Sequence, residues 1–100
     1  MSIEVKKMDD GNTVQVKIEG RFDFSLHKEF RDAYKDLPEE SQYIIDMGST
    51  DYMDSSALGM LLLLREHAGN ESAKIKIQGC RPTIKQILSI SNFEKLFDIS

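Results

Sequence analysis

The hydrophobic period of this chain changes several times along its length, and these changes limit the folds open to it. Between Thr13 and Glu19 apolar and polar residues alternate, whereas after Ser25 the apolar residues return every three to four positions. Alternation is typical of a strand with one face in water, and the longer spacing is typical of an amphipathic helix. The apolar residues with helical spacing are Leu26, Phe30, Ala33, Tyr34 and Leu37. Because strand and helix patterns follow one another, the sequence predicts an α/β fold.

The N-terminal part of the chain predicts a β-hairpin. Ile3 and Val5 share one side of a first strand, and the alternating segment supplies the second strand. The residues that join the two strands are rich in Asp, Gly and Asn, which favour a tight turn. The helix that follows is expected to have Ser25 as its N-cap and to stop at Pro38.

The middle of the chain predicts a buried strand and a second helix. Residues 43–45, Tyr-Ile-Ile, form a short apolar run between polar clusters, which indicates a central strand. A polar loop is expected over 48–54, and a helix should run from the serines to about Ala68. Asp54 and Ser55 are both candidates for the N-cap of this helix.

The C-terminal third continues the alternation of strand and helix. Residues 73–78 alternate again and predict a strand near an edge of the sheet. Pro82 is well placed as the first residue of a third helix, and Asn92 is expected to cap a short last helix with Phe93, Leu96 and Phe97 as its apolar set. Strands separated by helices need crossover connections, so we expect a mixed sheet covered by helices.

Length, charge and cysteine content exclude several classes of protein. One hundred residues allow one domain, residues 1–100. Thirteen basic against seventeen acidic side chains give a net charge of −4 without a run rich in Lys or Arg, so nucleic acid is not an expected partner. The N-terminus lacks an apolar signal core and the longest strongly apolar run, 60–64, is too short to span a bilayer, so no membrane anchor is expected. The single cysteine, Cys80, forms neither an internal disulfide nor a Cys-based zinc site, which favours the cytoplasm.

The stretch 51–60 joins the predicted buried strand to the second helix and carries the clearest chemical signal. It reads Asp-Tyr-Met-Asp-Ser-Ser-Ala-Leu-Gly-Met. A helix start presents free backbone N–H groups and about half a unit of positive charge, so it tolerates an anion. A phosphate on one of these hydroxyls would add roughly −1.5 to −2 charges, which the N–H groups can partly accommodate. The alternative is that Asp54 and the two serines only cap the helix.

The apolar run 60–64 covers about 400° of a helix, which is more than the one face that packs on a sheet. Some of these side chains must therefore face outward. The expected core stripe is Ala57, Met60, Leu61, Leu64 and Ala68. The opposite side holds Ser55, Gly59, Leu62 and Glu66, with Ser56 and Leu63 adjacent. We interpret this side as a partner surface that Gly59 leaves flat, with a fully covered helix as the alternative.

Three segments of the sequence resemble one family of bacterial regulators. The segment 53–59, Met-Asp-Ser-Ser-Ala-Leu-Gly, resembles the phosphorylation motif of the anti-sigma-factor antagonists, the STAS-domain proteins, which usually reads Met-Asp-Ser-Ser/Thr-Gly-Leu-Gly. Residues 20–23, Gly-Arg-Phe-Asp, resemble the family's Gly-x-hydrophobic-Asp, and residues 89–97 are similar to its C-terminal segment. Ala57 departs from the usual glycine, which costs backbone freedom but favours helix. The resemblance implies an α/β, STAS-type single domain whose mixed β-sheet is opened by an N-terminal hairpin and covered by helices.

The resemblance also implies a protein-binding switch in signal transduction, with no reaction of its own. In the family, the unphosphorylated protein sequesters an anti-sigma factor that is also an ATP-dependent serine kinase. Phosphorylation releases this partner, and a PP2C-type serine phosphatase removes the phosphate. The acceptor implied here is Ser55, with Ser56 as the second choice, and neither a cofactor nor a metal is implied. We expect a monomer when the protein is free. The implied partner-binding residues are Asp23, Asp54, Ser56, Gly59, Leu62 and Leu63.

Other functions stay open on the sequence alone. Asp46, Asp51 and Asp54 gather near the end of the predicted central strand and could hold Mg²⁺, as in a receiver-like domain that is phosphorylated on aspartate. A hydrolase is a further alternative, although the sequence has no Gly-x-Ser-x-Gly elbow. The side chains that it could use are His27, Asp23 and Ser55. A STAS regulator could also bind a partner unrelated to sigma factors, such as a histidine-kinase-like or cyclase protein.

Overall fold

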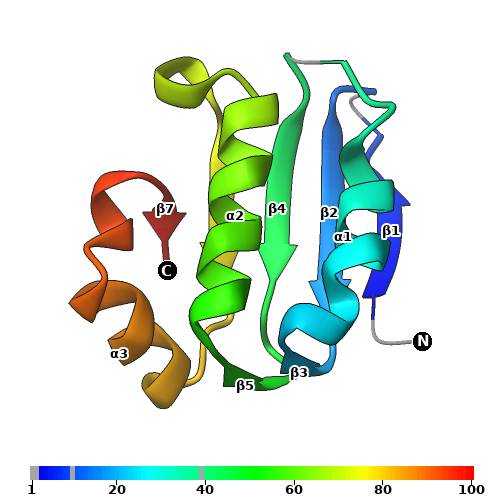
Figure 1. Ribbon diagram of the computed structural model, residues 1–100. Coiled ribbons are helices and arrows are strands. Elements are labelled where there is room, and N and C mark those ends of the chain that lie inside the picture. The colour runs from blue at the N-terminus through cyan, green and yellow to red at the C-terminus, as the bar shows by residue number, and fades with distance from the viewer. Residues whose placement is uncertain (1–2, 10, 39) are drawn as a thin grey trace.

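The computed structural model describes residues 3–9, 11–38 and 40–100, and it confirms the α/β fold (Figure 1). A five-stranded sheet contains, in spatial order, β1 (Ile3–Lys7), β2 (Thr13–Ile18), β4 (Gln42–Asp46), β6 (Ile75–Gln78) and β7 (Asp98–Ile99). A second sheet consists of β3 (Gly20–Phe22) and β5 (Thr50–Met53). The helices are α1 (His27–Tyr34), α2 (Ser55–His67) and α3 (Pro82–Ile90). None of the helices in the described part of the chain has the length and apolar character needed to cross a bilayer.

Strand pairing confirms the predicted hairpin and the mixed sheet. β1 pairs antiparallel with β2, and the other neighbours in the large sheet pair in parallel. The predicted hairpin turn includes position 10, which lies outside the described residues. Parallel neighbours need crossovers, which α1, α2 and α3 supply in turn. β6, predicted near an edge, lies beside the edge strand β7.

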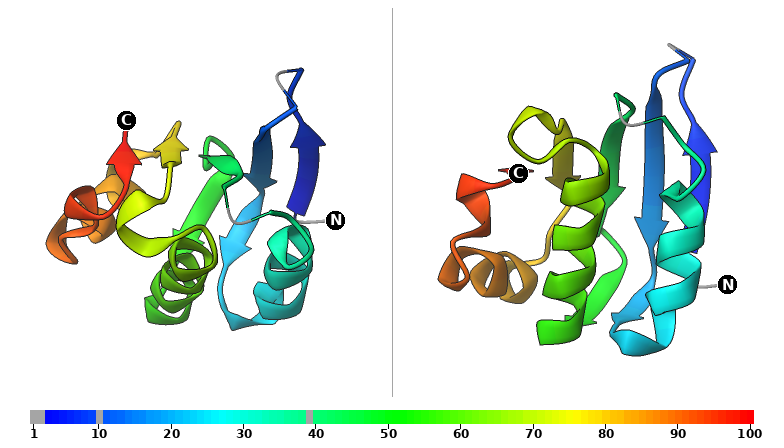
Figure 2. Two further views of the ribbon diagram at one scale, coloured as in Figure 1. Left: turned by 90° about the horizontal axis from the view of Figure 1, so that it is seen from above. Right: turned by 45° about the horizontal axis from the view of Figure 1, so that its top comes forward.

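Two rows of core side chains cross the three central strands on the face covered by α1 and α2. The rows are Val14–Tyr43–Ile75 and Val16–Ile45–Ile77. All six side chains are buried, and Figure 2 shows α1 and α2 lying on the same side of the sheet. α1 and α2 therefore form one layer, and within the described residues the opposite face of the sheet carries no helix.

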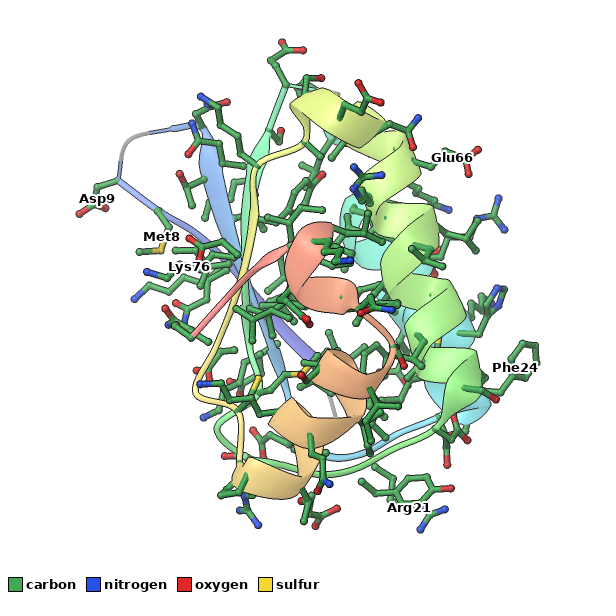
Figure 3. The ribbon with its side chains drawn as sticks, turned by 90° about the vertical axis from the view of Figure 1, so that its left-hand side faces the viewer. Met8, Asp9, Arg21, Phe24, Glu66 and Lys76 are labelled. Atoms are coloured by element: carbon green, nitrogen blue, oxygen red, sulfur yellow. The ribbon has the colours of Figure 1, made fainter. Side chains whose placement is uncertain are left out.

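That opposite face is polar. Lys17 on β2 lies opposite both Glu4 on β1 and Asp46 on β4, so unlike charges alternate across three strands. Lys76 on β6 also projects away from the helices (Figure 3). Glu4 and Lys76 are exposed and Lys17 and Asp46 are half-buried, so this face of the sheet is in contact with water.

The hydroxyl group of Tyr43 is buried in the core. The side chain is 1% exposed, and within the described residues the hydroxyl has no hydrogen-bond partner. Burial raises the pKa of Tyr43 to about 12, because the phenolate would lose its hydration. Tyr43 therefore fills core volume but leaves one buried polar atom unsatisfied.

The start of the first helix differs from the prediction that Ser25 is its N-cap. A 3-10 turn, Phe24–Leu26, precedes α1, and Asp23 caps this turn. The Asp23 carboxylate accepts hydrogen bonds from the Ser25 backbone N–H and hydroxyl, at 3.0 and 2.6 Å. Because a carboxylate is a stronger acceptor than a hydroxyl, Ser25 donates instead of capping. α1 ends at Tyr34, ahead of Pro38.

A strand replaces the loop predicted over 48–54. Residues 50–53 form β5, which pairs in parallel with β3. Only Thr50 and Met53 of this strand are buried, so its burial does not alternate. The Thr50 hydroxyl donates a 2.7 Å hydrogen bond to the carbonyl of Ile18, which ties the start of β5 to the end of β2. The prediction was wrong because strands of three or four residues are too short to show a period.

The C-terminal segment also departs from the prediction. Asn92 adopts a left-handed conformation, with φ of 60°, and among the described residues its side chain makes no cap hydrogen bond. Asn tolerates this conformation better than most residues, so it turns the chain instead of capping a helix. The segment Phe93–Lys95 is a 3-10 turn, and Phe93 and Phe97 are buried as predicted while Leu96 is 36% exposed. The chain then returns to the sheet as β7.

Candidate functional site

β3 and β5 end side by side at one end of the molecule (Figure 1). Phe22 lies opposite Met53 in this parallel pair, and both side chains are buried. The next residue after each strand is an aspartate, Asp23 after Phe22 and Asp54 after Met53. Because Phe22 and Met53 lie opposite each other in parallel strands, the two aspartates that follow them occupy neighbouring positions, and each begins a helical segment.

Asp54 is the N-cap of α2. Its backbone is extended, with φ of −125° and ψ of −174°. Its Oδ1 accepts hydrogen bonds from the backbone N–H groups of Ser56 and Ala57, at 3.1 and 3.2 Å, and from the Ser56 hydroxyl at 2.6 Å. These contacts satisfy two of the free N–H groups at the start of α2. Of the two candidates for the cap, Asp54 is therefore the residue that serves, and Ser55 is the first residue of the helix.

Asp23 repeats this geometry. Its backbone is also extended, with φ of −136° and ψ of −172°, and its Oδ1 accepts from both the N–H and the hydroxyl of Ser25. Its Oδ2 accepts a 3.3 Å hydrogen bond from Arg21 Nε. The hydrogen bonds from Ser25, and secondarily those from Arg21, lower the pKa of Asp23. We call the two arrangements, Asp23 with Ser25 and Asp54 with Ser56, the twin caps.

The three serines of the twin caps and the α2 start differ in what their hydroxyl groups do. The hydroxyls of Ser25 and Ser56 each donate to the aspartate of their cap. Ser55 is exposed, and among the described residues its hydroxyl has no hydrogen-bond partner. Ser56 is half-buried. Of the two predicted phosphate acceptors, Ser55 thus presents an accessible and unengaged hydroxyl, whereas that of Ser56 is bound.

The two sides of α2 agree with the sequence prediction. The core stripe is buried throughout, at 4% exposure or less: Ala57, Met60, Leu61, Leu64 and Ala68. On the other side Leu62 and Leu63 are 42% and 50% exposed. Ser55, Gly59 and Glu66 are exposed with them, and Figure 3 shows Glu66 projecting outward from this side. Among the described residues, a Cβ added at Gly59 would meet nothing within 4 Å, so this position faces open space. The alternative of a fully covered helix is wrong. We call this exposed side the leucine face.

Phe24 is a surface residue that the sequence did not assign. It occupies in the first cap the position that Ser55 occupies in the second. Its side chain is 67% exposed, and its ring stacks on that of His27 with centroids 4.9 Å apart. Figure 3 shows Phe24 projecting away from the body of the molecule. Phe22 is fully buried, and only the course of β3 into the cap decides which of the two phenylalanines faces water.

Arg21 places a positive charge beside the twin caps. Its guanidinium lies over the ring of Tyr52, with Cζ 3.9 Å from the ring centroid. These two residues lie opposite each other in the register of β3 and β5. The same guanidinium group donates to Asp23, so the cation is shared between an aromatic face and a carboxylate.

The structure does not assemble the acidic cluster of a receiver-like domain. Asp46 Oδ1 accepts a 2.9 Å hydrogen bond from the N–H of Gly48, Asp54 serves as the N-cap, and Asp51 is exposed. In the part of the chain that the structure describes, no group of three His, Cys, Asp or Glu side chains could hold a metal ion. The prediction that Asp46, Asp51 and Asp54 gather to hold Mg²⁺ is therefore wrong. His27, the base that a hydrolase would need, stacks on an aromatic ring.

Comparisons with known proteins agree with the fold. Residues 5–98 match the family model described as "Mlab, STAS domain". A STAS-domain-containing protein of Pseudomonas aeruginosa is 50% identical over 101 residues, which is 100% of this chain and 100% of the relative. Both matches span the twin caps and the leucine face.

Solved structures share the fold at low sequence identity. An anti-sigma factor antagonist from Mycobacterium paratuberculosis superposes with a TM-score of 0.79 at 19% identity, over 97% of this chain and 82% of that one. The Bacillus cell fate determinant SpoIIAA, solved in its phosphorylated form, has a TM-score of 0.74 at 16% identity, over 98% and 90% of the two chains. At these identities the likeness is one of fold.

Proposed function

Because this chain belongs to the STAS domain family, we propose that it is an anti-sigma-factor antagonist whose binding is switched by phosphorylation of Ser55. In its unphosphorylated form it sequesters an anti-sigma factor that is also a serine kinase. Phosphate on Ser55 releases this partner, and a PP2C-type phosphatase restores binding. The protein acts in the cytoplasm and carries out no reaction of its own.

The observation that carries this proposal is the position of Ser55. It is the first residue of α2, it is exposed, and within the described residues no group engages its hydroxyl. It also shares one side of α2 with Leu62, which is 42% exposed. A group added to Ser55 would therefore stand at the edge of the leucine face, where it alters the surface without entering the core.

Phosphorylation of Ser55 should leave the fold nearly unchanged. The phosphate would lie at the N-terminus of α2, where the helix dipole favours a negative charge by about 0.3–1 kcal/mol. The carboxylates of Asp23 and Asp54 oppose this gain, but water screens charges at an exposed site. The packing of α2 is made by the core stripe on its opposite side, which the phosphate does not touch.

An interface that covers Ser55 would respond far more strongly. A dianion enclosed by a partner must lose its hydration beside Leu62 and near Asp54, which costs several kcal/mol unless the partner supplies a cation. A cost of about 3 kcal/mol lowers the affinity by about a hundredfold. The unphosphorylated form would thus bind and the phosphorylated form would dissociate, while both stay folded.

The structural neighbours support the class of partner. One of them is an anti-sigma factor antagonist, and another was solved with its phosphate in place. A regulator unrelated to sigma factors would use the same surface, so the identity of a captured partner distinguishes the two. Wild-type protein serves as the bait, and a Leu63→Asp variant serves as its matched control because Leu63 is half exposed and outside the core. An anti-sigma factor retained by the wild type and lost from the variant supports the proposal.

Phosphosite mapping tests the switch directly. The protein is co-expressed with candidate kinases and phosphatases, its intact mass is measured, and the modified residue is located by fragmentation. The expected result is one phosphate on Ser55 that the phosphatase removes. A phosphate mapped away from both Ser55 and Ser56, or none with any kinase that binds the protein, contradicts the proposal.

A further inference from the structure

We propose that Asp54 selects Ser55 as the phosphate acceptor by holding the hydroxyl of the adjacent Ser56. This inference rests on the proposed function, because it concerns the same modification. Both serines lie in the first turn of α2 and carry the same nucleophile, so residue type does not distinguish them. The selection is instead made by the N-cap, which makes Asp54 a positioning residue for the reaction.

The hydroxyl of Ser56 is engaged by a strong acceptor. Ser56 Oγ donates to Asp54 Oδ1 at 2.6 Å, and the same oxygen accepts the backbone N–H groups of Ser56 and Ala57. Hydrogen bonds to a carboxylate are short and about twice as strong as bonds between neutral groups. Ser56 is also half-buried. Its hydroxyl proton therefore lies between two oxygens inside the cap.

Phosphoryl transfer would have to break this arrangement at Ser56. In the transfer, the serine Oγ forms a bond to the γ-phosphorus of a nucleoside triphosphate held by the kinase. The bond from that phosphorus to the bridging oxygen breaks, the nucleoside diphosphate leaves, and the hydroxyl proton passes to a base of the kinase. At Ser56 the lost proton is the one that bridges Oγ to Asp54, so two oxygens 2.6 Å apart would face each other without a hydrogen. A dianion would also stand beside a carboxylate. At Ser55 no contact of the cap is lost.

The first of the twin caps provides an internal comparison. Ser25 is exposed, as Ser55 is, but its hydroxyl donates to Asp23 at 2.6 Å. Ser25 and Ser55 are thus both exposed, but among the residues described only the hydroxyl of Ser25 is engaged in a hydrogen bond. If engagement decides, Ser25 should accept no phosphate although it is accessible.

The contact between Asp54 and Ser56 also permits the opposite role. A carboxylate that accepts a hydrogen bond from a hydroxyl is placed to act as a general base, which would make Ser56 the acceptor. In that case removing the carboxylate would abolish the reaction, whereas selection by Asp54 predicts that the reaction continues and its site changes.

The test compares two variants of the cap with a variant of the acceptor. Asp54→Asn keeps an oxygen acceptor at the N-cap, and Asp54→Gly keeps a tolerated N-cap residue without any acceptor. Ser55→Ala leaves Asp54 and Ser56 in place. Each protein is treated with the kinase that modifies the wild type, and the occupancy of each serine is measured by fragmentation mass spectrometry over time.

The expected results differ by site as well as by rate. Wild type and Asp54→Asn carry phosphate on Ser55. In Asp54→Gly the ratio of phosphate on Ser56 to that on Ser55 rises about tenfold or more, since Ser56 is released. Ser55→Ala is modified on the order of a hundredfold more slowly than wild type, because phosphorylation of its remaining serine, Ser56, must break the charge-assisted hydrogen bond to Asp54. Asp23→Gly, the matched change in the other cap, leaves the ratio of Ser56 to Ser55 unchanged.

Several results would overturn the inference without touching the proposed switch. In the first, Ser55→Ala is phosphorylated on Ser56 at close to the wild-type rate. In the second, Asp54→Gly carries phosphate only on Ser55. In the third, Asp54→Gly carries no phosphate although Asp54→Asn is modified. Loss in both Asp54 variants points to the carboxylate as a base and overturns it as well. A wild-type protein that no binding kinase modifies overturns the switch itself and this inference with it.

Discussion

A negative charge at Ser55 should separate the stability of the fold from the binding of the partner. Ser55→Asp places a carboxylate on the first residue of α2, whose first turn contains no acidic residue. The matched control is Thr83→Asp, which adds the same charge to the exposed first turn of α3, also free of acidic residues. Ser55→Ala removes the hydroxyl without adding charge.

The expected change in stability is small for both charged variants. Interaction with the helix dipole contributes about 0.3–1 kcal/mol at each site. At Ser55 the carboxylates of Asp23 and Asp54 reduce this gain, and solvent keeps each repulsion below about 1 kcal/mol. The free energy of unfolding should therefore change by less than about 1 kcal/mol, a shift of at most about 4–8 °C in the melting temperature of a chain of this size.

The expected change in binding is large for one variant only. A carboxylate on Ser55 must be desolvated against a partner that covers the leucine face, so Ser55→Asp should raise the dissociation constant by about a hundredfold or more. Thr83→Asp and Ser55→Ala should leave it within about threefold of the wild-type value. Urea unfolding followed by circular dichroism measures the free energy of unfolding, and isothermal titration calorimetry with the captured partner measures the dissociation constant.

Two outcomes would refute this reasoning. In one, Ser55→Asp and Ser55→Ala bind the partner equally well, so that charge at this position does not control docking. In the other, Ser55→Asp loses more than about 2 kcal/mol of stability while Thr83→Asp does not, so that the loss of binding reflects unfolding.

Further predictions concern the core, a turn and the surface. Tyr43→Phe should raise the free energy of unfolding by about 1 kcal/mol in urea melts at neutral pH, because it removes a buried hydroxyl without a partner among the described residues; an equal or lower value contradicts this. Burial raises the pKa of Tyr43 to about 12, above the ordinary value of 10.0, so the native state holds this proton more tightly than the unfolded chain does. The stability of the wild type should therefore fall as the pH rises from about 10 toward 12. Tyr43→Phe should lack this contribution to the pH dependence. Gly79→Ala should lower the free energy of unfolding by about 2 kcal/mol or more in the same urea assay, since φ is +74° and the added Cβ would come within 3.1 Å of a backbone nitrogen. Gly20→Ala, at φ of +78° in open space, should lower it by only about 1 kcal/mol. Equal losses in the two variants would show that the contact at Gly79 is unimportant. Phe24→Ala should weaken partner binding about tenfold or more with little effect on stability. The control is Val5→Ala, which changes an exposed apolar residue on β1 and should alter neither binding nor stability. Titrations that give Phe24→Ala the wild-type affinity would exclude Phe24 from the interface.

The sequence by itself determined the elements whose signal is local and repeated. The alternation after Thr13 is a property of neighbouring residues, and it predicted a strand that the structure contains as β2. The spacing of apolar residues from Ala57 to Ala68 likewise predicted which side of α2 is buried and which side exposes Leu62 and Leu63. Such patterns can be read without coordinates because a helix or strand imposes its period on every residue it contains.

Only the tertiary structure decided how the site is assembled. β3 and β5 are too short to show a period, and their pairing joins segments that are far apart in the sequence. That pairing sets Asp23 beside Asp54, and the course of the chain out of β3 turns Phe24 toward water. The difference between the hydroxyls of Ser55 and Ser56 depends on backbone geometry at the cap, where a hydrogen bond forms or fails over less than an ångström. Adjacent residues of one type therefore differ in chemistry for a reason that lies in three-dimensional contacts and not in residue order.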